Sequence, residues 1–303
     1  MTVEGVHGEA GFASPEESRL FRRGAAAFAA SVPADPADDG FFGPESVTWR
    51  LHADLSTPVS GLRSLLLQAL HPLAMAGVDQ HSQWRADPAG RYASTAAYVI
   101  TTTYGDRASA RAAADRVRKI HEWVRGVDPV TGRHYEAGDP DLLIWVHAAL
   151  VDSGLAAADL YGTRLSAADR DAYVAEMTAA AELVGVPPGR APASASELDA
   201  YFTAVRPELT ASPGAASVAE YLIGMPDVEP ELADLWRDLA AASVASLPGW
   251  ARQLYGLDDV VAPPRDAVRQ VLGVLDVIYL GEPGVLEARQ RLTLRMRAAG
   301  SGG

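Results

Sequence analysis

The chain has 303 residues, 48% of them hydrophobic and 21% charged, so it can bury a sizeable core and is not a wholly disordered chain or a coiled coil. It contains no Cys, which excludes disulfides, iron–sulfur clusters, thiolate metal sites and Cys nucleophiles. Its net charge of −13 disfavours generic binding to nucleic acid or to anionic membranes, which depends on basic patches. Nearly all basic residues are Arg, and Ala is abundant, a composition typical of a high-GC bacterial genome.

The first forty residues predict an N-terminal extension, with a helix over 15–30 and an acidic, Pro-bearing link over 33–40. The chain does not begin with a basic segment followed by an apolar run, so we expect no signal peptide. It also has no uninterrupted apolar stretch of about 18 residues, so we expect no stable membrane insertion. These features together favour a cytoplasmic protein.

Residues 41–297 predict one all-α domain of roughly ten to twelve helices, because helix-forming residues dominate and Gly or Pro separates the helical segments. Asp106 is expected to cap a helix that runs to about Val127. Capping boxes are expected where Ser166 precedes Asp169 and where Ser194 precedes Glu197. A break is expected at His71, because the residue before a Pro disfavours the helical conformation. The small-residue tail, 298–303, is predicted to be disordered.

Seven histidines are the main candidates for chemistry, and several fall in segments expected to be helical and buried. His121 lies beside an apolar stripe of Ala113, Val117, Ile120, Val124 and Val127, which the spacing predicts to face the core. A buried imidazole needs a polar partner. His121 is therefore either a core residue bonded to a carbonyl or carboxylate, or a ligand of a metal or haem iron.

A second candidate is the helix that begins near Arg91. Arg91, Thr95 and Tyr98 are spaced four and three residues apart and so share one face. That face either lines a polar cavity or is an ordinary amphipathic face with Arg91 near solvent. His147, flanked by apolar residues, and His81, near a helix end, are acid–base candidates; a satisfied core residue and helix-end stabilisation are the simpler readings.

No spacing in the chain is a metal-ligand signature, and no Gly-rich phosphate loop or Gly-x-Ser-x-Gly elbow is present. The residues alone therefore predict an acidic helical protein with buried histidines and an Arg/Thr/Tyr face.

Several segments, in this order, resemble the MpaB-type oxygenase family, which includes the rubber oxygenases (latex clearing proteins). The resemblance covers about residues 40–255. It rests on Gly43–Trp49, Leu65–Pro72, Met75–Val78, His81-Ser82, Asp87–Arg91 with Thr95, His121–Gly126, Tyr135–Pro140 and Trp145–Ala148.

The resemblance implies a globin-like helical core that holds haem b, with one His as the proximal iron ligand. His121 matches that ligand, and Arg91 with Thr95 matches a preceding Arg/Thr pair. Arg91 could then pair with a haem propionate, and Thr95 and Tyr98 could bond to oxygen at the iron. Rubber oxygenases can carry a Lys between that Arg and Thr as a distal ligand; here Ser94 stands there, so an open distal site is expected.

Three functions follow as hypotheses. The first is a haem-dependent oxygenase or oxidoreductase that acts on a small apolar molecule with dioxygen or peroxide. The second is a haem carrier or gas sensor without turnover, and the third is a cofactor-free enzyme that uses His81 or His147 as a base. The sequence leaves the oligomeric state open.

Overall fold

The computed structural model describes residues 19–224 and 232–300, so His7 and the first residues of the helix predicted over 15–30 lie outside the described part. Within it, fourteen α-helices, one 3-10 turn (Arg206–Glu208) and one two-stranded hairpin confirm the all-α class. The first seven helices are α1 Arg19–Ser31, α2 Val47–His52, α3 Thr57–Ala69, α4 Pro72–His81, α5 Pro88–Tyr104, α6 Arg107–His121 and α7 Pro140–Tyr161. The others are α8 Ala167–Val184, α9 Ala195–Val205, α10 Pro213–Gly224, α11 Ala233–Ala245, α12 Gly249–Tyr255, α13 Arg265–Leu280 and α14 Val285–Gly300.

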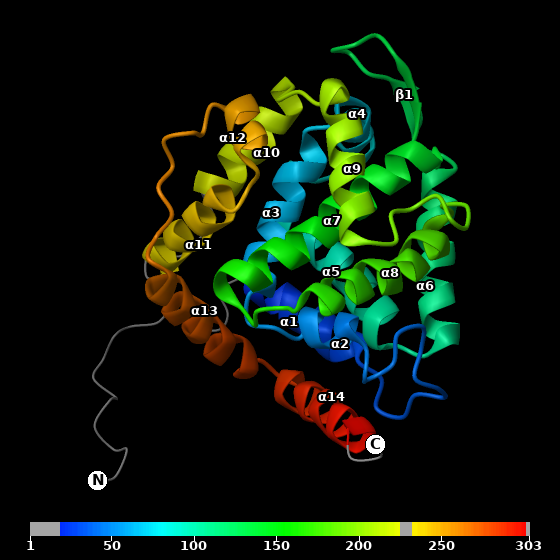
Figure 1. Cartoon of the computed structure of the whole chain (residues 1–303), viewed down its shortest axis with the longest axis vertical. Coiled ribbons are helices and arrows are strands. Elements are labelled where there is room, and N and C mark those ends of the chain that lie inside the picture. The colour runs from blue at the N-terminus through cyan, green and yellow to red at the C-terminus, as the bar shows by residue number, and fades with distance from the viewer. Residues whose placement is uncertain (1–18, 225–231, 301–303) are drawn as a thin grey trace.

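The core is built around α7, which runs through the middle of the molecule beside α3 (Figure 1). Leu66, Leu67 and Leu70 of α3 pack with Trp145 and Val151 of α7 in the largest apolar cluster. Polar groups join the same two helices: Trp145 Nε1 donates to the Gln68 carbonyl at 3.0 Å. Burial of large apolar side chains therefore fixes the central pair.

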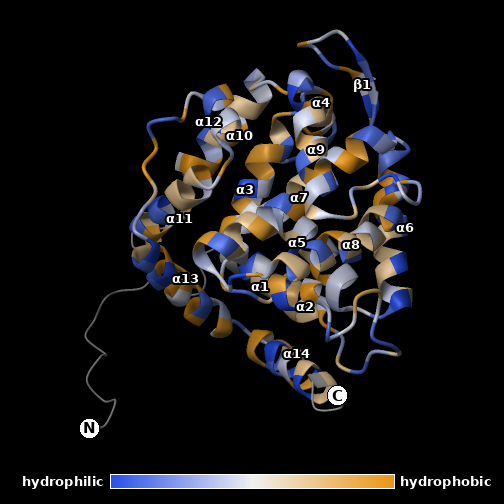
Figure 2. Ribbon diagram, viewed as in Figure 1, coloured by the Kyte–Doolittle hydropathy of each residue, from blue (hydrophilic) through white to orange (hydrophobic). Residues whose placement is uncertain are grey.

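The helix α7 is also long and apolar enough to cross a membrane by length and composition. However, 72% of its most apolar window is buried inside the fold, where other helices surround it (Figure 2). It is therefore the central core helix of this fold.

Several predicted helix boundaries are confirmed. Asp106 caps α6 by accepting a hydrogen bond from the Ser109 N–H at 2.7 Å. Ser166 and Asp169 form a reciprocal capping box at α8. Ser194 caps α9, but the Glu197 carboxylate accepts from the Ala193 N–H instead of closing the box on Ser194. The chain breaks between α3 and α4 at His71, as the following Pro predicts.

The helix predicted from Asp106 to about Val127 is wrong over its last six residues. The helix α6 ends at His121, and the next residues form a β-hairpin: β1 (Arg125–Val127) pairs antiparallel with β2 (His134–Glu136). The predicted core stripe fails with it, because Ile120 is 61% exposed and Val127 is 44% exposed. The buried face of α6 consists of Ala110, Ala113 and Ala114, and it continues one turn further on at half-buried Val117.

The two ends of the described chain lie against each other. The helix α1 packs on α5, with Ala25 fully buried, and also contacts α14. Arg291 of α14 donates to the Val32 carbonyl at 3.2 Å, just after α1. Helix α14 ends only at Gly300, so the residues 298–300 that were predicted to be disordered are helical, since Ala298 and Ala299 favour a helix.

Candidate functional site

The helix pair α5 and α6 carries the predicted site residues. Helix α5 begins where Asp87 accepts a hydrogen bond from the Gly90 N–H at 3.0 Å, with Pro88 in its first turn. From residue 92 to residue 101 its side chains are only half buried or exposed, although α1 and α6 both pack against it. Thr95 and Tyr98 are therefore both half buried on this helix.

His121 is the last residue of α6 and lies half buried on the inner face, four residues after Val117. Its Nδ1 is buried and has no hydrogen-bond partner among the described residues. Burial, together with the positive charge of Arg91, lowers the pKa of His121 below its ordinary value. A buried nitrogen lone pair on a neutral imidazole without a partner is suited to accept a metal or a proton donor.

Arg91 and Thr95 hold each other on α5. The Arg91 guanidinium donates to Thr95 Oγ1 at 2.7 Å, and Thr95 Oγ1 donates back to the Arg91 carbonyl at 3.1 Å. Arg91 is exposed at the start of α5, as one of the two sequence readings expected, and makes no ion pair with any residue in the described ranges; partial desolvation lowers its pKa from the ordinary value. A cation that is partly desolvated and lacks an anion favours binding of a carboxylate or another anionic group.

Tyr98 lies one turn further along α5, and its hydroxyl is buried with no hydrogen-bond partner in the part of the chain described. Burial raises its pKa to about 12, against the opposing effect of the nearby Arg118 charge. The phenol therefore stays protonated at neutral pH and can donate one hydrogen bond. An unpaired buried hydroxyl costs free energy, so its position favours a ligand contact.

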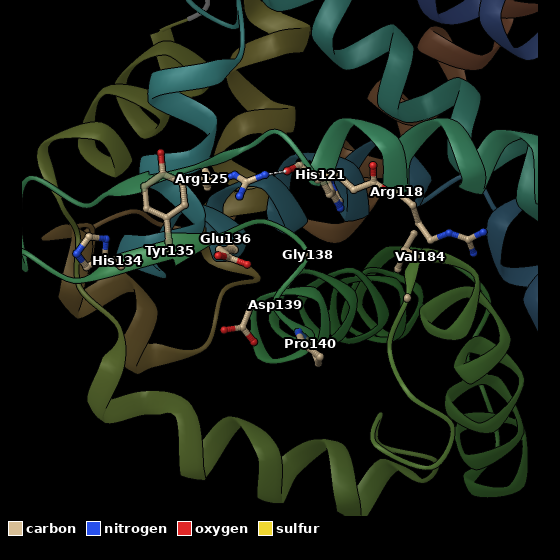
Figure 3. A pocket seen from close by; sticks show the side chains of 12 residues that line it. Arg118, His121, Arg125, His134, Tyr135, Glu136, Gly138, Asp139, Pro140 and Val184 are labelled. Atoms are coloured by element: carbon tan, nitrogen blue, oxygen red, sulfur yellow. Dashed lines mark hydrogen bonds between the residues drawn. The ribbon is translucent and has the colours of Figure 1, made fainter.

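A pocket of about 930 Å³ opens beside His121 (Figure 3). Its wall comes from four places: the end of α6, the hairpin, the start of α7 and the end of α8. Figure 3 shows His121 and Arg118 on one side, Glu136 near the middle, and His134 and Asp139 on the far sides. Seven of its twelve lining residues are charged or His, so it can orient a polar part of a ligand next to the imidazole.

The hairpin forms one wall of this pocket, and its close packing against α4 holds that wall in place. Tyr135 is buried behind the hairpin, and its hydroxyl donates to Gln80 Oε1 at 2.8 Å. A Cβ on Gly126 would lie 2.8 Å from the Tyr135 hydroxyl and 2.9 Å from Gln80 Oε1. Only Gly fits there, and this packing turns Arg125 and Glu136 toward the pocket.

The opposite wall ends in a left-handed glycine. Gly185 follows α8 with a φ of 113°, and the Val186 N–H closes the helix by donating to the Ala181 carbonyl at 3.1 Å. Arg118 reaches across from α6 and donates to the Leu183 carbonyl at 3.0 Å. Arg118 thus connects the wall of the pocket with the neighbourhood of Tyr98.

The structure does not bring all the predicted residues together. Arg91 and Ser94 line a second pocket of about 530 Å³ beside Arg23, at the start of α5. Thr95 and Tyr98 line neither pocket. Arg91 and His121 line different pockets, and what connects them is that the Arg91 charge lowers the pKa of His121.

The two further histidines lie elsewhere. His81 is exposed at the end of α4, and its Nε2 lies 3.2 Å from the Arg125 carbonyl on the hairpin. His147 is 7% exposed inside α7, lines neither pocket, and makes no hydrogen bond within the described ranges. Burial lowers the pKa of His147 to about 4, so it is neutral at pH 7 and a weak base.

Among the described residues, no group of three or more His, Asp or Glu side chains could hold a metal ion by itself. A group that brings its own equatorial ligands, as haem does, needs only one imidazole from the protein. The unpaired Nδ1 of His121 fits such a group, whereas Arg91 lines the second pocket and Tyr98 lines neither pocket.

Sequence reasoning missed the pocket wall formed by the hairpin. No residue of the acidic loop before α7 was among the candidate site residues, whereas Glu136 and Asp139 line the pocket. The available signal was the turn chemistry of Asp128-Pro129 and Gly132 between two short extended runs, which is typical of a hairpin.

Comparison with family models gives one match, over residues 49–278, to "ER-bound oxygenase mpaB/B'/Rubber oxygenase, catalytic domain". The matched range spans most of the chain and includes α5, α6 and the pocket. A search of curated proteins found no match, and neither did a search of solved structures.

Proposed function

The chain belongs to the MpaB and rubber oxygenase family, over its oxygenase catalytic domain, and from that premise we propose that it is a haem b-dependent oxygenase with His121 as the iron ligand. The observation that carries the proposal is the buried Nδ1 of His121, which has no hydrogen-bond partner in the described part of the chain. When bound, haem would supply the activation of dioxygen or peroxide. The globin-like character of the core belongs to this proposal.

Three side chains would assist in stated ways. Arg91 would bind an anionic group of the cofactor or substrate, since it is partly desolvated and without an ion pair among the described residues. Thr95 would orient Arg91 through their 2.7 Å hydrogen bond. Tyr98, protonated because its pKa is raised to about 12, would donate a hydrogen bond into the space between α5 and α6.

The side opposite His121 would stay open to small ligands. Ser94 occupies the position where a rubber oxygenase can carry a Lys ligand, and its hydroxyl donates to the Gly90 carbonyl of its own helix at 2.8 Å. Ser94 is therefore engaged in the backbone and is a poor iron ligand.

The substrate we propose is a small apolar molecule, an assignment that rests on the family, since the described pocket wall mixes polar and apolar surface. We place the protein in the cytoplasm, as the sequence suggests.

Absorbance of the purified protein in the Soret region tests the proposal. We expect His121→Ala to lose at least tenfold in haem affinity while it keeps its helical circular dichroism. The control is His134→Ala, which removes another imidazole from the same pocket and should leave the Soret band intact. An unchanged Soret band in His121→Ala would overturn the assignment of the ligand.

Oxygen consumption with a reductant, or peroxide consumption, then separates the oxygenase from a haem carrier or gas sensor. A protein with a full Soret band and no consumption of either oxidant would be a carrier or a sensor. A protein that binds no haem would point to the cofactor-free alternative, in which His81 or His147 acts as the base.

A further inference from the structure

Exposed apolar side chains cluster where α6 ends and the hairpin begins. Fourteen large hydrophobic side chains are exposed in the part of the chain described, and four of them fall within residues 120–130. Trp123 is 78% exposed, which is unusual for the largest apolar side chain, and Ile120 is 61% exposed. A cluster of this kind marks a surface for interaction.

The helical part of this cluster forms one outward face. Arg116, Lys119, Ile120 and Trp123 follow at spacings of three, one and three residues, and all four are exposed. The Trp123 N–H donates to the Ile120 carbonyl at 3.1 Å, so the two side chains project from one ordered turn. The buried face of α6, which includes Ala110 and Ala114, points away from Arg116 and Lys119, whereas Ile120 lies one and a half turns or more beyond these buried residues and is exposed where the helix ends.

The hairpin adds an ordered apolar tip. Asp128 is buried and accepts hydrogen bonds from the Val130 N–H at 3.1 Å and from the Thr131 N–H at 2.9 Å. This turn holds Val130 outward at 50% exposure, and Figure 1 shows the hairpin projecting beyond the helices. We call Arg116, Lys119, Ile120, Trp123, Val127 and Val130 the α6–hairpin rim.

The charge around the rim is the reverse of the charge of the whole chain. Residues 116–136, which span the rim and the whole hairpin, carry five basic and three acidic side chains, in a chain whose net charge is −13. Arg116 and Lys119 make no ion pair with a residue in the described ranges, and one of the three acids, Asp128, is buried in the hairpin turn. The rim therefore attracts an anionic surface, although the rest of the chain does not.

The shape of the rim favours a lipid surface over a protein partner. Protein interfaces concentrate their binding energy in packed central pockets, whereas these apolar side chains project from a helix end and a hairpin tip. Protruding Trp and aliphatic side chains beside Lys and Arg are typical of segments that lie in the headgroup region of a membrane.

We propose that the α6–hairpin rim docks this protein on an anionic lipid surface, with Ile120, Trp123 and Val130 entering the headgroup region and Arg116 and Lys119 binding phosphates. This is peripheral attachment without a spanning segment. If the proposed function holds, the pocket beside His121 opens next to the lipid, because Arg125 and Val127 share the hairpin face that lines it. An apolar substrate could then pass from the lipid into the pocket.

Flotation of the full-length protein with vesicles tests the docking and needs neither haem nor turnover. We expect binding to phosphatidylcholine vesicles that contain about a third phosphatidylglycerol, weaker binding to pure phosphatidylcholine, and loss of binding at high salt. Trp123→Ala should lower the partition coefficient about tenfold, because it removes the largest exposed apolar side chain.

Matched controls separate the rim from general effects. Lys119→Glu should weaken binding to the anionic vesicles severalfold, whereas Arg164→Glu, an exposed and unpaired cation before α8 in the described structure, should not. Val261→Asp changes a side chain that is 83% exposed away from the rim, and it should bind like the parent.

No flotation with anionic vesicles at low salt would overturn the proposal, and so would equal binding by the parent, Trp123→Ala and Lys119→Glu. Light scattering measures the oligomeric state. A dimer that Trp123→Ala dissociates would assign the rim to a second copy of this chain and overturn the lipid assignment. Retention of haem is measured in the same samples, so a failure of the docking is distinguished from a failure of the proposed function.

Discussion

Helices α7 and α5 are both long and both central, but they are built differently. Helix α7 buries fourteen of its twenty-two residues, whereas α5 buries only three of its seventeen, Thr102, Thr103 and Tyr104 at its end. Between α3 and α7 a buried cation finds partners: Arg63, which is 2% exposed, reaches Asp152, Ser153 and the Ser246 carbonyl, although His147 of α7 makes no hydrogen bond within the described ranges. On the α5 and α6 pair, Tyr98 and His121 keep buried polar atoms unpaired.

In the region around α7, protein groups supply the partners of buried Arg63. On the α5 and α6 pair, a bound ligand would have to supply the missing partners. Removal of a polar group should therefore destabilise the region around α7 and leave the α5 and α6 pair unchanged or more stable. The predictions below test that difference in the protein without haem.

The largest effect is expected at the buried ion pair. Asp152→Ala would leave the Arg63 charge buried beside one hydroxyl and one carbonyl, which should lower the free energy of unfolding by about 3 kcal/mol. Urea unfolding followed by circular dichroism measures this loss. The control is Asp234→Ala, which breaks the exposed pair with Arg237 and should have little effect. If Asp152→Ala and Asp234→Ala lost the same free energy of unfolding, the buried pair would not be the more stabilising one and the prediction would be wrong.

The next effect is a dependence on pH that comes from His147. Its pKa is about 4 in the folded protein and about 6.5 in the unfolded chain, so the unfolded chain takes up a proton first as the pH falls. The stability due to the neutral imidazole is complete above about pH 6.5 and is lost as the pH falls toward 4.

Between pH 7 and pH 5 this loss should be about 2 kcal/mol, and His147→Gln should remove that part of the slope. Urea midpoints at the two pH values measure it, with His134→Gln on the exposed hairpin as the control. A slope that His147→Gln leaves unchanged would place the titrating group elsewhere; His52, whose pKa is also lowered to about 4 by burial, is the next group to test.

Removing the hydroxyl group from two different tyrosines should change the free energy of unfolding in opposite directions. Tyr255→Phe removes a hydroxyl that donates to the Leu66 carbonyl at 2.7 Å, and it should cost about 1 kcal/mol. Tyr98→Phe removes a buried hydroxyl without a partner in the described chain, and it should be neutral or stabilise the protein by up to about 1 kcal/mol. Thermal unfolding compares the two, and a clear destabilisation by Tyr98→Phe would show that its hydroxyl has a protein or water partner.

The smallest effect on stability is expected at Thr95. Thr95→Val keeps the shape but loses the hydrogen bond from Arg91, so the free energy of unfolding should change by less than about 0.5 kcal/mol. The haem-loaded variant should nevertheless differ severalfold from the parent in cyanide affinity. Thr293→Val removes a similar bond to the preceding turn of α14 and should change neither quantity.

Helix identity was the part of the fold that local sequence determined best. Ser166 and Asp169 formed the expected box, and the break at His71 followed from Pro72. The end of α6 was wrong, because apolar spacing at Ile120, Val124 and Val127 looked like a buried stripe, although Ile120 and Val127 are exposed. Apolar periodicity shows that residues share one face, but it does not show whether another part of the fold will pack against that face.

The site was predictable in a different way. The spacing of Arg91, Thr95 and Tyr98 correctly placed them on one helix, and the segment order indicated the family. The walls of the pocket were not predictable, because Arg118, Glu136 and Val184 converge from segments distant in sequence. The approach of Gly126 to Tyr135, which sets the hairpin wall, likewise depends on packing against α4.

The partners of Arg63 also bear on the order in which the chain can fold. This side chain on α3 is 90 residues from Ser153 and 183 residues from Ser246 along the sequence. During synthesis, α3 and α7 emerge well before Ser246, so for that interval the guanidinium lacks one of its native acceptors. Contacts of such long range form late. The central pair therefore closes fully only after α11 has left the ribosome, and chains truncated before that helix should be captured by chaperones or degraded.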